Sequence, residues 1–195
     1  TWRVVRESGA LGDTLLQTPG YRMLTAETSG GGFRMQTIPL SPRTAIAWGP
    51  DGRLYHGWTD SLHVEVRSLN GSSTDIASVP TDPVPLTETA RDSVLKDTDS
   101  DIRSKLGPAL PDTKPAFTDL IVADDGRIWV KRPKKKAEPD TTPWWILNSE
   151  SKKIQEVRLP SEVDLEVVQN GRAYGTTETE MGAPAVVRYR IDSSS

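Results

Sequence analysis

Short runs in which apolar and polar residues alternate cover most of the chain. Val64 and Val66, for example, alternate with Glu65 and Arg67, which is the period of two expected of a half-buried strand. Strand-like runs occupy residues 1–7, 13–18, 45–55, 63–67, 75–80, 120–129, 144–147, 154–160, 165–174 and 185–191. The pattern predicts an all-β protein built from short strands.

One strand–turn–strand motif occurs three times, at residues 45–55, 120–129 and 165–174. Each copy has an apolar run, then a Gly-Arg pair in a turn, and then an apolar residue followed by an aromatic one. Asp-Gly and Asn-Gly are strong hairpin signals, because Gly adopts positive φ without a Cβ clash. Each copy is therefore predicted to be a β-hairpin.

Further strands and a regular spacing follow these hairpins. Two more strands are predicted after each of the first two hairpins, and one after the third. Gly52 and Gly126 lie 74 residues apart, and Gly126 and Gly171 lie 45 apart. The first spacing falls to about 40 once the longer connection at residues 80–117 is discounted. Four strands at a period of about 40–45 residues are typical of a β-propeller blade. An immunoglobulin-like sandwich is the alternative, but it does not predict the repeated motif.

The strand assignment divides the chain into about three blades of a partial β-propeller with four-stranded antiparallel blades. The expected units are the end of one blade (1–19), a blade (43–80), a helical insertion (81–116), a second blade (117–160) and an incomplete last blade (163–191). Propellers usually close with four to eight blades. We therefore expect the remaining blades of the same ring, or a second copy, to cover the open face.

The insertion has the pattern of one or two short helices. Thr87 suits an N-cap, and Leu95, Ile102 and Leu106 lie at helical spacing. The Gly107-Pro108 pair is expected to end the helical stretch.

Composition restricts the class of protein. The 195 residues are 35% hydrophobic and 26% charged, which is typical of a soluble globular domain, and no run of about 18 apolar residues could span a membrane. There is no Cys, which excludes disulfides, Cys-ligated zinc and thiol nucleophiles. The net charge of −3 argues against a nucleic-acid partner. The basic cluster at residues 131–136 is interpreted as a solvated loop.

With the hairpins placed, the chain resembles the uncharacterised bacterial six-bladed β-propeller proteins. The resemblance covers most of residues 42–191 and rests on DPVPLT at 82–87, KPAF at 114–117, DDGRIWV at 124–130 and VRLP at 157–160. It implies the C-terminal half of a six-bladed ring, exported to the periplasm or the cell exterior. The first residue is Thr1 rather than Met, so we expect a processed or truncated piece.

The propeller topology predicts where binding residues would gather. The connections between blades, and those between each blade's second and third strands, share one face, and here they are the long ones: residues 19–43, 80–117, 133–142 and 178–182. Binding residues concentrate on long loops held by a rigid scaffold. The candidate binding residues on this long-loop face are Arg43, His56, Lys114, Phe117 and Arg132.

No catalytic motif or complete metal site is present in the sequence. The two histidines, His56 and His63, cannot supply a three-His zinc site, and the chain lacks a Gly-x-Ser-x-Gly elbow, a His-Glu-x-x-His motif and a P-loop. The favoured hypothesis is a non-catalytic scaffold that binds a small molecule, glycan or protein on the long-loop face without a cofactor.

The alternative hypothesis is a metal-dependent enzyme of the lactonase or sugar-dehydrogenase kind. Such an enzyme would hold a divalent cation with side chains around the central channel. The candidate carboxylates near the starts of first strands are Asp119, Asp164 and Glu166.

Overall fold

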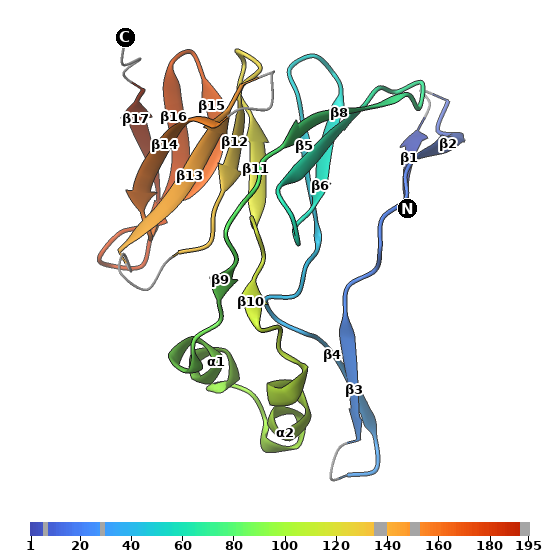
Figure 1. Cartoon of the computed structure of the whole chain (residues 1–195), viewed down its shortest axis with the longest axis vertical. Coiled ribbons are helices and arrows are strands. Elements are labelled where there is room, and N and C mark those ends of the chain that lie inside the picture. Colours follow the sequence, from blue (N-terminus) through green and yellow to red (C-terminus); the bar gives the residue numbers. More distant parts are fainter. Residues whose placement is uncertain (6–7, 28–29, 135–139, 149–152, 192–195) are drawn as a thin grey trace.

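The computed structural model describes residues 1–5, 8–27, 30–134, 140–148 and 153–191. Antiparallel sheets and two short helices make up this part of the chain (Figure 1). The predicted all-β fold class is confirmed.

Two four-stranded sheets and one three-stranded sheet form the main body. The first sheet contains β5 (Thr44–Trp48), β6 (Leu54–Trp58), β7 (His63–Arg67) and β8 (Ser73–Ser78). The second contains β11 (Asp119–Val122), β12 (Ile128–Lys131), β13 (Thr141–Leu147) and β14 (Lys153–Pro160). The third contains β15 (Asp164–Gln169), β16 (Arg172–Glu178) and β17 (Pro184–Arg190).

These sheets have the topology of propeller blades. Within each sheet the strands pair in sequence order, and every pair is antiparallel. The first strands of successive sheets lie together, because β11 contacts β5 on one side and β15 on the other. This arrangement is that of a partial β-propeller, as the sequence predicts.

The repeated turns explain why the motif recurs. The Asp51 carboxylate accepts hydrogen bonds from the backbone N (3.0 Å) and Nε (2.6 Å) of Arg53, and Asp125 does the same for Arg127 at 3.0 and 2.7 Å. In the third copy the turn is Asn170-Gly171, and both residues have positive φ (53° and 66°). All three turns form the predicted hairpins.

Apolar side chains fill the spaces between neighbouring sheets. Val64, Phe117 and Val130 are wholly buried between the first and second four-stranded sheets. Trp129 and Trp144 are buried on the other face of the second sheet, toward the three-stranded sheet. The alternation along each strand therefore supplies apolar groups to two interfaces at once.

A two-stranded sheet packs against the outer face of the first blade. It consists of β1 (Trp2–Val5) and β2 (Leu11–Leu16). Leu15 and Leu16 pack on Leu54, with Ile46 beside them. The strands predicted at the start of the chain are thus present.

Residues 19–43, predicted as a long connection, contain an additional hairpin of β3 (Met23–Glu27) and β4 (Phe33–Thr37). One face of the hairpin packs Ala26 on the helices. The other face leaves Met23, Phe33 and Met35 exposed. β3 lacks the alternation that signals a half-buried strand, and the alternation of β4 places Phe33 and Met35 on the exposed face. The prediction of a connection is corrected here, because the segment contains a hairpin.

The insertion is a pair of helices closed by a short ladder. It contains β9 (Val84–Pro85), α1 (Glu88–Leu95), α2 (Ser100–Ala109) and β10 (Thr113–Lys114). β9 and β10 pair with each other and bring the two ends of the insertion together. Thr87 caps α1, as predicted, by accepting a hydrogen bond from Ala90 N at 3.3 Å.

The predicted end of the helical stretch is wrong by two residues. α2 continues through Pro108 to Ala109, and Leu110 N donates to Leu106 O at 3.1 Å. Pro108 lies in the last turn of α2, where it removes one helical hydrogen bond. Within the described residues, neither helix is long and apolar enough to cross a membrane.

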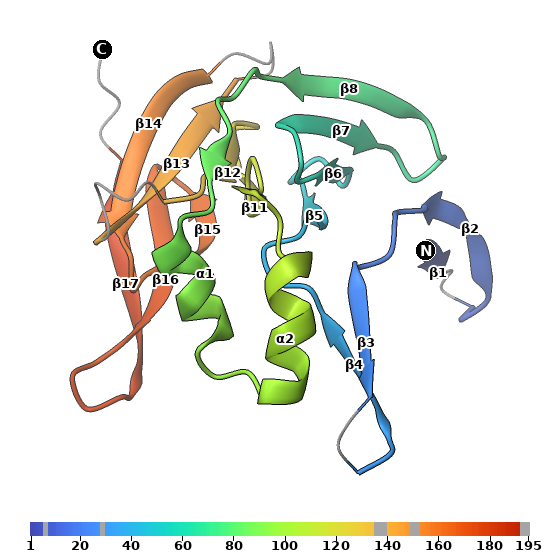
Figure 2. The same ribbon diagram turned by 60° about the horizontal axis from the view of Figure 1, so that its bottom comes forward.

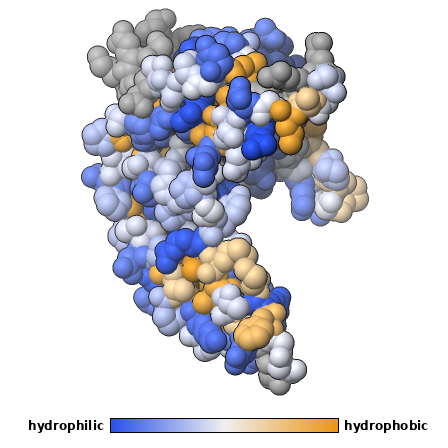
Figure 3. Space-filling model, turned by 90° about the vertical axis from the view of Figure 1, so that its right-hand side faces the viewer, coloured by the Kyte–Doolittle hydropathy of each residue, from blue (hydrophilic) through white to orange (hydrophobic). Residues whose placement is uncertain are grey.

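The helices and the additional hairpin form one lobe. Ile102 and Leu106 of α2 are buried with Ala26 and Ile38 from the hairpin and the residues after it. Figure 2 shows α2 beside β3 and β4, below the sheets. In Figure 3 this lobe carries both apolar and polar surface and is set off from the sheets by a hollow.

Close packing at Gly57 provides a test of the arrangement. A Cβ at this position would lie 2.3 Å from the His63 carbonyl oxygen and 2.9 Å from Phe117 Cζ. We expect Gly57→Ala to lower the free energy of unfolding by about 1–3 kcal/mol, because backbone and core must shift to admit the methyl group. Urea denaturation measures the change. Gly20→Ala is the matched control, since nothing lies within 4 Å of its Cβ. Equal stability of the two variants would contradict the packing.

Candidate functional site

The long connections lie together at one end of the sheets. Figure 1 shows the helices at the end opposite the hairpin turns of β5–β6, β11–β12 and β15–β16. At this end the segment before α1 meets the outer strands of the second blade. A cavity of about 420 Å³, here called the Arg132 cavity, opens between them. It is lined by Asp82, Pro83, Val84, Pro85, Thr87, Arg132, Pro133, Pro143, Trp145, Glu156 and Arg158.

Arg132 is the most deeply buried charge of this cavity, with 7% of its surface exposed. It follows β12, and its backbone N donates to Pro143 O at 2.9 Å. Its Nη1 donates to Ala116 O, and the guanidinium carbon lies 4.2 Å from the centre of the Trp145 ring. Burial lowers the pKa of Arg132, while the Glu156 and Asp82 carboxylates oppose that shift. A guanidinium remains charged in such surroundings.

The Trp145 indole is held by charges at its edge and over its ring. Its Nε1 donates to Glu156 Oε2 at 2.9 Å, across the β13–β14 pair in which the two residues are direct partners. Lys153 Nζ lies 4.1 Å from the ring centre and 2.8 Å from the same oxygen. Arg158 Nη2 donates to Glu156 Oε1 at 2.8 Å. These contacts fix the indole as a wall of the cavity.

Lys114 lies beside the Arg132 cavity but not in its wall. Lys114 pairs with Val84 in the β9–β10 ladder, and its Nζ donates a hydrogen bond to Lys134 O at 2.8 Å. Burial lowers the pKa of Lys114, and the charge of Lys134 adds to the effect.

Arg43 and Phe117 meet at a second cavity, of about 300 Å³, between residues 37–43 and 115–118. Arg43 is exposed, and its Nη2 donates to Thr118 O at 3.0 Å. Phe117 lines the same cavity, but its side chain is wholly buried in the core between the blades. The role that the structure gives Phe117 is core packing.

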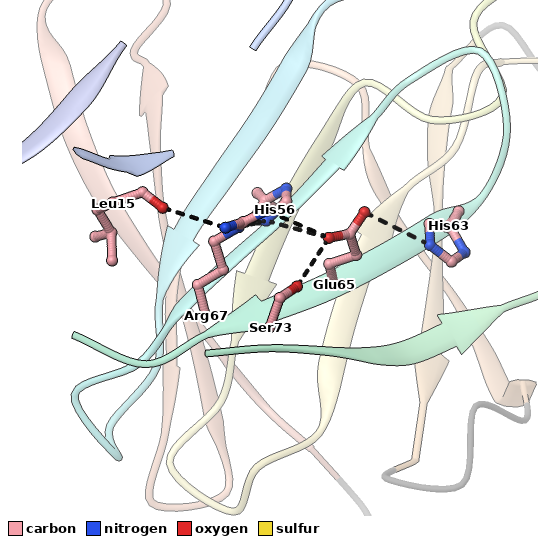
Figure 4. Close-up of polar contacts among 6 residues, drawn as sticks. All are labelled: Leu15, His56, His63, Glu65, Arg67 and Ser73. Carbon is pink, nitrogen blue, oxygen red and sulfur yellow. Dashed lines mark hydrogen bonds and ion pairs between the residues drawn. The ribbon is translucent and has the colours of Figure 1, made fainter. Parts of the chain in front are cut away.

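His56 lies in a third cavity, of about 250 Å³, where β1–β2 meets the first blade. Figure 4 shows Glu65 between His63 and the His56–Arg67 pair. Arg67 Nε donates to His56 Nε2 at 3.2 Å, and Arg67 Nη1 lies 3.5 Å from Leu15 O on β2. Both histidines have Nε2 3.8 Å from a Glu65 carboxylate oxygen. This network ties β2 to the first blade.

The five predicted residues are therefore distributed over three places. The structure brings Arg43 and Phe117 together, places Lys114 near Arg132, and sets His56 apart. The sequence reasoning missed Trp145 and Glu156. The signal for Trp145 was the Trp144-Trp145 pair, because adjacent strand residues face opposite sides of a sheet and the two indoles therefore reach different surroundings.

The carboxylates of the metal-enzyme hypothesis do not meet. Asp119 accepts from Leu120 N at 2.9 Å, Asp164 pairs with Lys131 at 3.2 Å, and Glu166 accepts from Thr176 at 3.3 Å. Among the described residues, no group of three or more His, Asp and Glu side chains could hold a metal ion. Lys135 and Lys136 of the basic cluster lie outside the described residues.

The His56 network predicts a pH-dependent stability. Burial lowers the pKa of His56, Arg67 and His63 lower it further, and Glu65 opposes the shift. The unfolded imidazole takes up a proton near pH 6.5, whereas the folded one resists protonation to lower pH. The stability that neutral His56 contributes is thus complete above about pH 6.5 and is lost as the pH falls below it.

We expect His56→Gln, which keeps an acceptor for Arg67, to flatten the fall in unfolding free energy between about pH 7 and pH 5. Urea titrations at several pH values measure the slope. His63→Gln is the matched control, since it removes the other imidazole of the same cavity. An unchanged slope in His56→Gln would show that His56 is not the titrating group.

Comparisons with known proteins show no family and a weak structural likeness. No protein-family model matches the chain, and no curated protein matches it at a significant level. A solved streptogramin B lyase matches at 11% identity with a TM-score of 0.35, over 97% of this chain and 61% of that one. The virginiamycin B lyase of Staphylococcus aureus matches at 12% identity with a TM-score of 0.35, over 97% and 62%. The chain spans about three fifths of the length of these structures, and such scores carry no inference about activity.

Proposed function

We propose that this chain is a non-catalytic binding protein that takes a small molecule in the Arg132 cavity. The observation that carries the proposal is the cavity itself, in which a buried guanidinium and a fixed indole face apolar walls. Small-molecule sites are typically concave, of about 300–1,000 Å³, mostly apolar, with a few placed polar groups. The cavity falls in this range and lies on the long-loop face.

The polar groups of the cavity support binding rather than chemistry. Glu156 accepts hydrogen bonds from the Trp145 indole, Lys153 and Arg158. A carboxylate whose oxygens already accept hydrogen bonds from three donors has little capacity left to take a proton from a substrate and is a poor general base. A glycan and a protein are the two other ligand classes that the sequence predicts. A concave cavity of this size favours a small molecule over either. The six-bladed ring, the export and the additional blades stay predictions.

The proposal is tested by filling the cavity. Pro83 is an exposed wall residue with no N–H to lose, so Pro83→Trp places an indole at the cavity without breaking a backbone hydrogen bond. We expect ligand-observed NMR with mixtures of neutral aromatics, sugars and organic acids to give compounds that bind the unaltered chain. Their binding should weaken at least tenfold in Pro83→Trp.

Pro184→Trp is the matched control, because Pro184 is exposed on β17 and lines none of the cavities described above. Binding that is equal in both variants would place the ligand elsewhere and reject the proposal. Thermal unfolding of each variant confirms that the fold is retained.

A further inference from the structure

The buried guanidinium of Arg132 has more N–H donors than acceptors within the described residues. It carries five N–H groups in a rigid fork, and within the part of the chain that the structure describes its side chain makes one hydrogen bond, from Nη1 to Ala116 O. Among the described residues, no carboxylate forms an ion pair with it. A buried charge is costly unless it is paired, so a group of this kind in the wall of a cavity favours an acceptor brought by a ligand.

Neither of the two carboxylates near Arg132 serves as its ion-pair partner within the described residues. Glu156 is already bound by Lys153 and Arg158. Asp82 is exposed, where solvent screens its charge. The cavity therefore keeps a positive centre at Arg132.

Apart from Thr87, the remaining lining residues are apolar. Pro133 and Pro143 are buried on the blade side, Pro83 and Pro85 lie on the opposite wall, and the Trp145 indole lies between Arg132 and Lys153. Proline rings and an indole edge suit a planar hydrocarbon body better than a hydroxyl-rich one, which would need more hydrogen-bonding partners than these walls offer.

We propose that the ligand of the Arg132 cavity is a small organic carboxylate with a flat apolar body. Its carboxylate would pair with the free edge of the Arg132 fork, and its body would lie against the proline walls. Arg–carboxylate pairs are charge-assisted and often bidentate, which gives them both strength and a defined orientation. This inference rests on the proposed function and specifies the ligand class.

The test compares two probes of equal shape and different charge, 2-naphthoate and 2-naphthamide. Calorimetric titration gives their affinities, and the Trp145 indole N–H resonance, assigned with Trp145→Phe, reports whether they enter the cavity. We expect naphthoate to bind at least tenfold more tightly than naphthamide, to shift the indole resonance, and to lose affinity as salt is raised.

Arg132→Gln should reduce naphthoate binding to the level of naphthamide, because it keeps a donor for Ala116 O and removes the charge. Arg188→Gln, an exposed change on β17, is the control and should leave both affinities unaltered. The comparison of the two probes on the unaltered chain stands even if Arg132→Gln does not fold.

The outcomes separate this inference from the proposed function. Equal affinities with a shifted indole resonance would overturn the carboxylate class and leave the binding function standing. No shift from either probe would also reject the carboxylate class, and the proposed function would then be decided by the mixed compounds and Pro83→Trp. If no compound class enters the cavity, both fail.

Discussion

The wholly buried Thr59 is the residue on which the long-loop face depends. Its N donates to Arg43 O at 2.9 Å, its Oγ1 accepts from Arg43 N at 2.9 Å, and its O accepts from Ala116 N at 2.7 Å. Buried backbone groups must be paired, so this residue joins the segment that precedes the first blade to the segment that precedes the second. Ala116 O in turn accepts from Arg132. These hydrogen bonds fix the segments that contain Arg43, Ala116 and Arg132 relative to one another. They thereby position the Arg132 cavity and the cavity at Arg43 and Phe117.

The features that the sequence predicted well are those that depend only on local sequence signals. The hairpins at Gly52, Gly126 and Gly171 form because turn chemistry and strand pattern agree there. The β3–β4 hairpin escaped prediction because its buried face is satisfied by the helices, some 60 residues later in the chain. The two-residue ladder of β9 and β10 is likewise a consequence of closing the insertion, and strands so short carry no periodic signal.

The candidate site was predictable in its location and in Arg132, but not in the partners of Arg132. Arg132 and Lys114 were expected on the long-loop face, and both lie there, because propeller topology fixes which connections share a face. Trp145 and Glu156 meet only through the register of β13 with β14, which is set by the whole ladder of that blade and includes an irregularity at Ile146 and Leu147. A shift of one residue would turn the indole to the other face of the sheet. Phe117 could not be told from a binding residue by sequence, since an aromatic before a strand suits a core equally well.

The two neighbouring tryptophans show how one strand can serve the core and a cavity at once. Trp144 is wholly buried toward the last sheet, whereas Trp145 faces the opposite side and meets Arg132 and Lys153. Removing Trp144 would open the core toward the last sheet, whereas removing Trp145 would release two cations and a carboxylate and also uncover part of the core between the first two blades. The frame supplies position and rigidity through residues such as Trp144, and it also carries the charges of β14, whereas Arg132 comes from the connection after β12. Under the proposed function, ligand choice can therefore change through residues 81–87 and 132–134 while the blades stay as they are.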